Sequence, residues 1–277
     1  TMASLPMYFP PSPFNLAEAL TCAELVATAY DMYTQWTKQG KPNQADKFAW
    51  TPTGPKIHYS QPIWGVATVL SIFKDPEPFG FAAWTDDGTV YLVYRGTESD
   101  ADWADDLELD QRAYGIVPDY GRVHDGFLSL YETVQVASLE AINLAPAPRR
   151  LYFIGHSLGS ALSTLAVPEV IACTGFKPGA QPLMHYNFAS PRVGNAGFAA
   201  AYNQNGVPTY RVVNTCDLVP EVPAAALGES LFQHVGTPVD FTAQYNSIGG
   251  NHSLTGAYSY AINHPDQPQG PLANELA

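Results

Sequence analysis

Cysteine, basic side chains and long apolar runs are all scarce in this chain of 277 residues. Three cysteines, Cys22, Cys173 and Cys216, are too few for a disulfide scaffold, and their odd number leaves at least one thiol free unless two chains pair. Thirteen lysines and arginines stand against twenty-six aspartates and glutamates, which gives a formal net charge of −13. That balance argues against binding to nucleic acid or to anionic lipid head groups, and it suits a neutral substrate.

No apolar run is long enough to cross a bilayer. The longest candidate, residues 63–73, is short and contains Gly65, Thr68 and Ser71, whereas a membrane-spanning helix needs about 20 consecutive residues. Residues 1–13 lack a basic stretch that leads into an apolar one, so we expect a signal peptide to be absent or already removed. We therefore expect a protein that is not transmembrane.

The apolar pattern alternates between strand and helix periods. We expect helices over residues 15–33, 125–144, 158–173, 195–202 and 253–262, and strands over residues 64–73, 79–85, 89–94, 151–154, 184–188 and 209–213. Alternating strands and helices behind an antiparallel start predict an α/β fold, in which a mixed, mostly parallel central sheet has helices on both faces. The length allows one domain or two, and without a linker we expect one domain over residues 1–277, with proline-rich tails at both ends.

The pentapeptide Gly155-His156-Ser157-Leu158-Gly159 matches the G-x-S-x-G pattern of a nucleophile elbow. The pentapeptide alone is a weak signal, because glycine and serine are common residues. The apolar residues 151–154 before it and the small-residue run 160–167 after it supply the strand, turn and helix that an elbow needs. Glycines are expected there because strand and helix approach too closely for a Cβ atom. We predict Ser157 as a nucleophile, with an ordinary glycine-bracketed turn as the alternative.

A serine hydroxyl near its free pKa is a poor nucleophile, so this chemistry needs a histidine base and a carboxylate that orients the imidazole. After an elbow of this kind the chain order is serine, acid, histidine. Asp217 follows the predicted strand 209–213 and is the candidate acid. Glu221 and Asp240 are the alternative acids, and a turn aspartate that accepts bonds from loop amides is the structural alternative for Asp217.

Seven histidines compete for the role of base. Four of them precede the acid, and His156 among these lies inside the elbow, where we expect its side chain to face away from the site. His252 follows the glycine-containing residues 248–251 and immediately precedes the predicted last helix, from where a loop histidine can reach the elbow. We predict His252 as the base, with His234 and His264, which lies beside the proline-rich tail, as the other histidines after the acid.

Several separated segments, together with the elbow, resemble the class 3 (fungal-type) lipase family of the α/β-hydrolase superfamily. In the family's order they are Tyr94-Arg95-Gly96-Thr97, Asp102-Trp103, Asp106-Leu107, residues 123–127, residues 189–195, residues 213–220 and His234-Val235-Gly236. The resemblance implies the α/β-hydrolase fold and a serine carboxylic-ester hydrolase. It also implies that His234 lies on a structural strand, where we expect a packed, hydrogen-bonded histidine. It favours a triacylglycerol lipase or carboxylesterase that works through a Ser-His-Asp triad and an acyl-enzyme.

The resemblance also implies an oxyanion hole and a lid. The backbone amide of Leu158 is expected to supply one oxyanion donor, and the resemblance adds the amide of Thr97 as the second. Residues 98–122 correspond to the family's lid and hold seven acidic residues between Glu98 and Asp110, so a solvated acidic helix is the alternative. The EF-hand spacing is missing from this segment, and we expect neither a metal nor an organic cofactor.

Other functions use the same residues. A feruloyl-type aryl esterase would differ in its pocket, whereas a catalytically inactive hydrolase-fold binding module and a peptidase belong to other functional classes. We expect a secreted monomer that acts on a neutral ester or lipid, with a lipid–water interface as one place of action.

Overall fold

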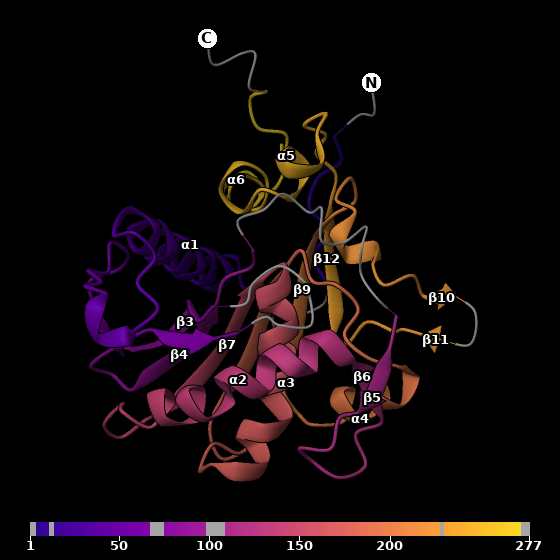
Figure 1. Cartoon of the computed structure of the whole chain (residues 1–277). Helices are drawn as coiled ribbons and strands as arrows, with labels where there is room; N and C mark the ends of the chain where they lie inside the picture. Colours follow the sequence, from indigo (N-terminus) through magenta and orange to yellow (C-terminus); the bar gives the residue numbers. More distant parts are fainter. Residues whose placement is uncertain (1–3, 11–13, 67–74, 98–108, 228–229, 273–277) are drawn as a thin grey trace.

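A mixed eight-stranded sheet runs through the computed structural model (Figure 1). The structure describes residues 4–10, 14–66, 75–97, 109–227 and 230–272. The strands of this sheet are β1 (His58–Tyr59), β2 (Ile63–Gly65), β3 (Glu77–Trp84), β4 (Thr89–Tyr94), β7 (Arg150–His156), β8 (Leu183–Phe188), β9 (Thr209–Asn214) and β12 (Thr237–Phe241). Their order is β1-β3-β4-β7-β8-β9-β12, and β2 pairs with β3. The pairs from β4 to β12 are parallel and those of β3 are antiparallel, so the predicted mixed sheet is confirmed.

Helices cover both faces of the sheet, as the alternating pattern predicts. The helices are α1 (Leu16–Lys38), α2 (Asp125–Ile142), α3 (Leu158–Cys173), α4 (Ala196–Asn203), α5 (Ile248–His252), the π-helix η4 (Leu254–Ser259) and α6 (Tyr260–Asn263), with short 3-10 turns η1 (Ala45–Lys47) and η3 (Val219–Glu221). Buried side chains of α1, η4 and α6 form the core on one face, and those of α2, α3 and α4 form the core on the other (Figure 1). Two small hairpins lie outside the sheet, β5 (Gln111–Ala113) with β6 (Arg122–His124) and β10 (Ala226–Leu227) with β11 (Ser230–Leu231).

The predicted elements differ in accuracy along the chain. Strand β4 and helix α3 begin and end at the predicted residues. Strand β2 ends at Gly65, and residues 67–74 of the predicted strand lie outside the described residues. The predicted final helix 253–262 is present but irregular: a short helix ends at His252, and a π-helix over 254–259 and a four-residue α-helix follow it. His252 is therefore the last residue of α5 and not a loop residue.

The predicted lid lies only partly within the described chain. Residues 98–108 are outside the described residues, and residues 109–122 contain β5, a loop and the first residue of β6. Tyr114 in that loop is fully buried, and its hydroxyl donates to the carbonyl of Leu165 in α3 at 2.6 Å. Ile116 and Val117 pack against the same core. The described end of the predicted lid segment is therefore anchored to α3.

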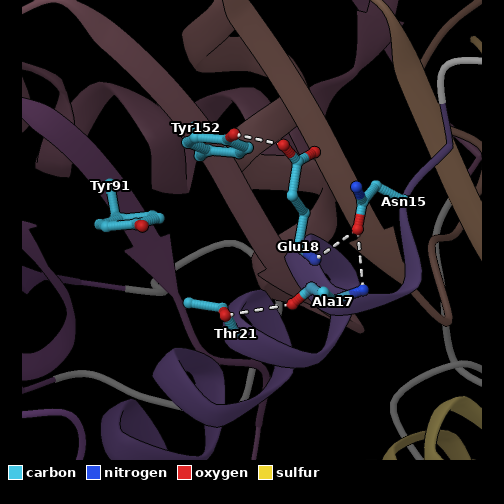
Figure 2. A pocket seen from close by; sticks show the side chains of 6 residues that line it. All are labelled: Asn15, Ala17, Glu18, Thr21, Tyr91 and Tyr152. Carbon is cyan, nitrogen blue, oxygen red and sulfur yellow. Dashed lines mark hydrogen bonds between the residues drawn. The ribbon is translucent and has the colours of Figure 1, made fainter.

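The first turn of α1 is held by polar side chains and borders a pocket (Figure 2). The Asn15 Oδ1 atom accepts the amides of Ala17 and Glu18, and the Glu18 carboxylate accepts the hydroxyls of Tyr152 and Tyr186 at 2.8 and 2.7 Å. The pocket has a volume of about 220 Å³ and is lined by Asn15, Ala17, Glu18, Thr21, Tyr91 and Tyr152. Glu18 and Tyr30 lie twelve positions apart in α1, so this pocket lies roughly 18 Å along the helix axis from Tyr30.

The N-terminal residues pair with the outer strand of the sheet. Leu5 and Thr242 exchange both backbone hydrogen bonds, at 3.2 and 3.1 Å, and the Tyr8 amide donates to the carbonyl of Asp240 at 2.8 Å. Strand β12 therefore has a backbone partner on its outer side as well as β9 on its inner side.

The cysteines form no disulfide. Cys22 is buried in α1, Cys173 is exposed at the end of α3, and Cys216 is half-buried beside the candidate acid. In the described part of the chain, no helix combines the length and apolar character that crossing a bilayer requires.

Candidate active site

Strand β7 turns directly into α3 at Ser157. The backbone of this serine has φ 57° and ψ −129°, a positive φ that residues with a side chain rarely adopt. A Cβ atom on Gly155 would lie 2.2 Å from the Gly159 carbonyl oxygen, and one on Gly159 would lie 2.4 Å from that of Tyr94. The predicted steric need for both glycines is therefore confirmed, and the turn places the Ser157 side chain at the carboxyl end of β7.

The predicted acid and base meet in the fold. The His252 Nδ1 atom lies 2.8 Å from the Asp217 Oδ2 atom. The Asp217 side chain is fully buried and that of His252 is nearly so. Because an ionised carboxylate only accepts hydrogen bonds, Nδ1 carries the proton that joins the pair. That tautomer leaves the Nε2 lone pair of His252 available as a base.

The Ser157 hydroxyl is buried, with 1% of the residue exposed. Within the described part of the chain its Oγ atom has no hydrogen-bond partner, so the bond to His252 that catalysis requires is not formed in this conformation. Hydrogen bonds of this kind are often long before substrate binds and shorten in the complex. The structure thus joins two of the three predicted residues and leaves the hydroxyl unpaired.

His156 connects the elbow to the candidate base, contrary to the expectation that it faces away. Its ring centroid lies 4.7 Å from that of His252, and its Nε2 atom lies 2.9 Å from the His252 carbonyl oxygen. A carbonyl can only accept, so Nε2 donates and the Nδ1 atom accepts from the Tyr30 hydroxyl at 2.7 Å. Burial, with a smaller effect of the nearby His252, holds the His156 pKa well below its ordinary value, so this imidazole stays neutral.

Two further side chains hold the acid and the base, and no sequence pattern identified either of them. The Tyr258 hydroxyl donates to Asp217 Oδ2 at 2.6 Å and accepts from the Asn214 amide at 3.2 Å. Burial, then the Asp217 charge, raises the Tyr258 pKa well above its ordinary value, so it remains a donor. Asn251 donates from its side chain to the Cys216 carbonyl at 2.9 Å, which ties α5 to the acid loop.

The two predicted oxyanion donors lie in the elbow and on the loop beside it. Leu158 is the first residue of α3, and amides in the first turn of a helix have no partner within that helix. Thr97 follows Gly96, where a Cβ atom would lie 2.7 Å from the Ser157 Cβ atom. The loop after β4 therefore runs against the nucleophile residue, and the Gly96 amide is fixed there by the Tyr30 hydroxyl at 3.0 Å.

The alternative acids and bases are placed elsewhere. Glu221 forms an ion pair with Arg192 at 2.9 Å and its side chain is 70% exposed. Asp240 lies on β12, and His264 bonds within its own helical turn. The half-buried His234 donates to the Pro220 carbonyl at 2.8 Å, and desolvation, with the charge of Arg211, lowers its pKa to about 3.

Comparisons with known proteins show which proteins this chain resembles. Residues 91–227 match the family model described as Lipase (class 3). A lipase from Rhizomucor miehei is 35% identical over 152 residues, which cover 53% of this chain and 40% of the relative. A secreted mono- and diacylglycerol lipase from Fusarium solani is 33% identical over 142 residues, which cover 50% of this chain and 40% of the relative. The chain thus spans less than half the length of these two curated relatives.

A solved structure of a triacylglycerol lipase, described as having a serine protease triad at its catalytic centre, superposes with a TM-score of 0.60. It is 27% identical, and the match covers 81% of this chain and 79% of that one. This likeness and the sheet order establish the α/β-hydrolase fold. The family model, the relatives and the shared fold all show that this chain is similar to the class 3 lipases.

Proposed function

We propose that this chain is a serine carboxylic-ester hydrolase that acts on acylglycerols and related neutral lipid esters through an acyl-enzyme. The buried Asp217–His252 pair beside the Ser157 elbow is the observation that carries this proposal. The related structure described with a serine protease triad in a triacylglycerol lipase supports the same assignment. In this proposal the sheet and the helices on both its faces form one catalytic domain.

The first half of the reaction forms the acyl-enzyme. The Ser157 Oγ atom attacks the ester carbonyl carbon while His252 Nε2 takes the hydroxyl proton, and Asp217 stabilises the resulting imidazolium. The carbonyl oxygen becomes an oxyanion, which the amides of Leu158 and Thr97 would stabilise. His252 then gives its proton to the leaving alkoxide, and the alcohol departs as the Ser157 ester forms.

The second half restores the enzyme. A water molecule loses a proton to His252 and attacks the acyl carbon, and the same two amides stabilise the second oxyanion. When this intermediate collapses, the Ser157 oxygen leaves and recovers its proton from His252. The carboxylic acid is released.

Burial of the site favours a substrate that arrives at an interface. Ser157, Thr97 and His252 are all buried, so an ester needs a change in conformation to reach the hydroxyl. The net charge of −13 also favours a neutral lipid over an anionic one. A secreted site of action fits the Fusarium relative, whose name describes it as secreted.

A p-nitrophenyl alkylphosphonate tests the reaction directly. Attack by Ser157 Oγ at phosphorus should release one p-nitrophenolate per chain and leave a covalent adduct, which mass spectrometry detects. Ser157→Ala should abolish the adduct, whereas Ser160→Ala, one turn into α3, should retain it. Retention of the adduct in Ser157→Ala would overturn the proposal.

Substrate presentation tests the lipid assignment. Hydrolysis of a short-chain triacylglycerol should rise steeply when its concentration passes the solubility limit and an interface forms. A flat response would assign the chain as an esterase for soluble esters, and preference for an aryl ester in the same assay would favour the feruloyl-type alternative.

A further inference from the structure

A buried ion pair lies next to the residue that precedes Thr97. Arg95 Nη2 lies 2.8 Å from Glu77 Oε1, and both side chains are almost completely inaccessible, at 0% and 2% exposure. The guanidinium also lies over the rings of Tyr33 and Phe79, with its central carbon 4.1 and 4.9 Å from the centroids. Removing two charges from water is costly, and apolar side chains in their place are often at least as stabilising. The pair therefore calls for a role other than stability.

Three hydrogen bonds fix the direction of the Arg95 guanidinium. Besides the Glu77 contact, Nε donates to the Pro78 carbonyl at 2.8 Å and Nη1 donates to the Gly96 carbonyl at 2.7 Å. Glu77 and Pro78 belong to β3, so two of these bonds anchor the group to the sheet. Because the guanidinium is a rigid planar fork, anchoring Nε and Nη2 also determines where Nη1 points. The Gly96 carbonyl is thus oriented by a group that is itself held on the sheet.

The Gly96 carbonyl and the Thr97 amide belong to one peptide unit. A trans peptide is planar, and its C=O and N–H groups point in opposite directions. Arg95, by holding the oxygen, therefore directs the Thr97 N–H away from the guanidinium. The preceding amide, that of Gly96, is held by Tyr30, and Gly96 itself abuts Ser157. Little rotational freedom remains in the loop that contains the predicted oxyanion donor.

We propose that Arg95, held by Glu77, is a positioning residue that orients the Thr97 amide toward the oxyanion. This inference rests on the proposed ester hydrolysis and adds to it a specific use for the buried charge. Oxyanion donors contribute most when they are aligned before the charge develops, because no reorientation is then needed in the transition state. Arg95 does not touch the substrate.

The test compares two substitutions at the pair with a matched control. Arg95→Lys keeps the charge, but an ammonium group cannot bond Glu77, Pro78 and Gly96 in the geometry of the fork. Loss of one oxyanion donor costs about 10²–10³ in kcat, so we expect a misaligned donor to lower kcat about 30-fold while KM changes less than about threefold. Glu77→Gln keeps an oxygen acceptor for Nη2, and we expect a smaller fall in kcat, about fivefold. Arg211→Lys, at a buried arginine of β9 that donates to the Val235 carbonyl, should leave kcat unchanged.

A tetrahedral inhibitor separates positioning from general destabilisation. An alkyl boronic acid adds to Ser157 and places an oxyanion in the hole, so its Ki should rise in each variant by the factor by which kcat/KM falls. A folded Arg95→Lys enzyme with unchanged kcat and Ki would overturn the inference. If Arg95→Lys does not fold, Glu77→Gln decides in the same way. Failure of the phosphonate to label the unmodified chain would instead overturn the proposed hydrolysis itself.

Discussion

The two halves of the proposed site are held by different means. At the elbow the backbone determines the geometry, because Gly155 and Gly159 let β7 and α3 approach too closely for any Cβ atom. On the acid–base side the geometry depends on side chains, since Tyr258 and His156 bond Asp217 and the His252 backbone. An added carbon should therefore damage the first half, whereas removal of a single polar group should damage the second.

The acid–base half should show the largest loss when its charge is removed. In Asp217→Asn the amide can donate to His252 Nδ1 and so favour the wrong tautomer, and kcat should fall about 10⁴-fold with the fold retained. Ester hydrolysis and circular dichroism of the purified variant measure the two effects. The matched control is Glu221→Gln, at the exposed alternative acid, which should keep near-normal kcat. A comparable loss in both variants would contradict the assignment of Asp217.

The elbow half should be disrupted by one added methyl group. Gly155→Ala places a Cβ atom 2.2 Å from the Gly159 carbonyl oxygen, and relieving this clash should cost about 3 kcal/mol of stability or more. Urea unfolding followed by tryptophan fluorescence measures the change. Gly175→Ala is the control, because a Cβ atom there meets nothing within 4 Å. Equal stability of the two variants would show that the elbow relaxes easily.

Low pH should lower the stability of the protein through the core beneath α3. Burial lowers the His185 pKa to about 3, and its Nε2 atom lies 2.8 Å from Ser163 Oγ in α3. The unfolded chain takes up a proton near pH 6.5 while the folded chain does not, so stability falls as pH drops from 6.5 toward 3. This histidine should account for roughly 3 kcal/mol between pH 6.5 and pH 4.

Urea unfolding at pH 7 and pH 4.5 tests this dependence on pH. His185→Gln should reduce the dependence of the unfolding free energy on pH by the contribution of one group, while the contributions of the buried His156 and the half-buried His234 remain. The exposed His264→Gln should leave this dependence unchanged. If the dependence of the unfolding free energy on pH is unaltered in His185→Gln, this imidazole takes up its proton at the same pH in the folded and the unfolded chain.

The smallest effect is expected from one hydroxyl on the acid–base side. Tyr258→Phe removes a buried donor to the Asp217 carboxylate, and hydrogen bonds to charged groups contribute about 1.5–3 kcal/mol. Val219 and His252 still donate to the carboxylate, so only part of this free energy should be lost from catalysis. We therefore expect kcat to fall about tenfold. Steady-state hydrolysis measures it, with Tyr260→Phe as the control. Wild-type activity in Tyr258→Phe would show that the carboxylate is held without this hydroxyl.

The difference between the elbow, whose geometry is set by the backbone, and the acid–base side, whose geometry depends on side chains, also explains what could be predicted from the sequence. The elbow depends on local rules, so the small-residue run and its glycines predicted α3 to the residue. The chain around His252 does not follow such a rule, because a π-helix changes the spacing of side chains within the last helical segment. Tyr258 reaches Asp217 only through that irregular turn, so no helical spacing from His252 could identify it. Contacts between distant segments, such as Tyr30 with His156, likewise carried no sequence pattern.

The pairing of the N-terminal residues with β12 has a consequence for assembly. An unprotected outer strand offers a row of amides and carbonyls on which another chain can build. Here Leu5 and Tyr8 already occupy bonding positions on that strand. A neighbouring molecule that adds a strand at this place must first displace residues 4–10. Deletion of these residues should therefore promote self-association through the sheet.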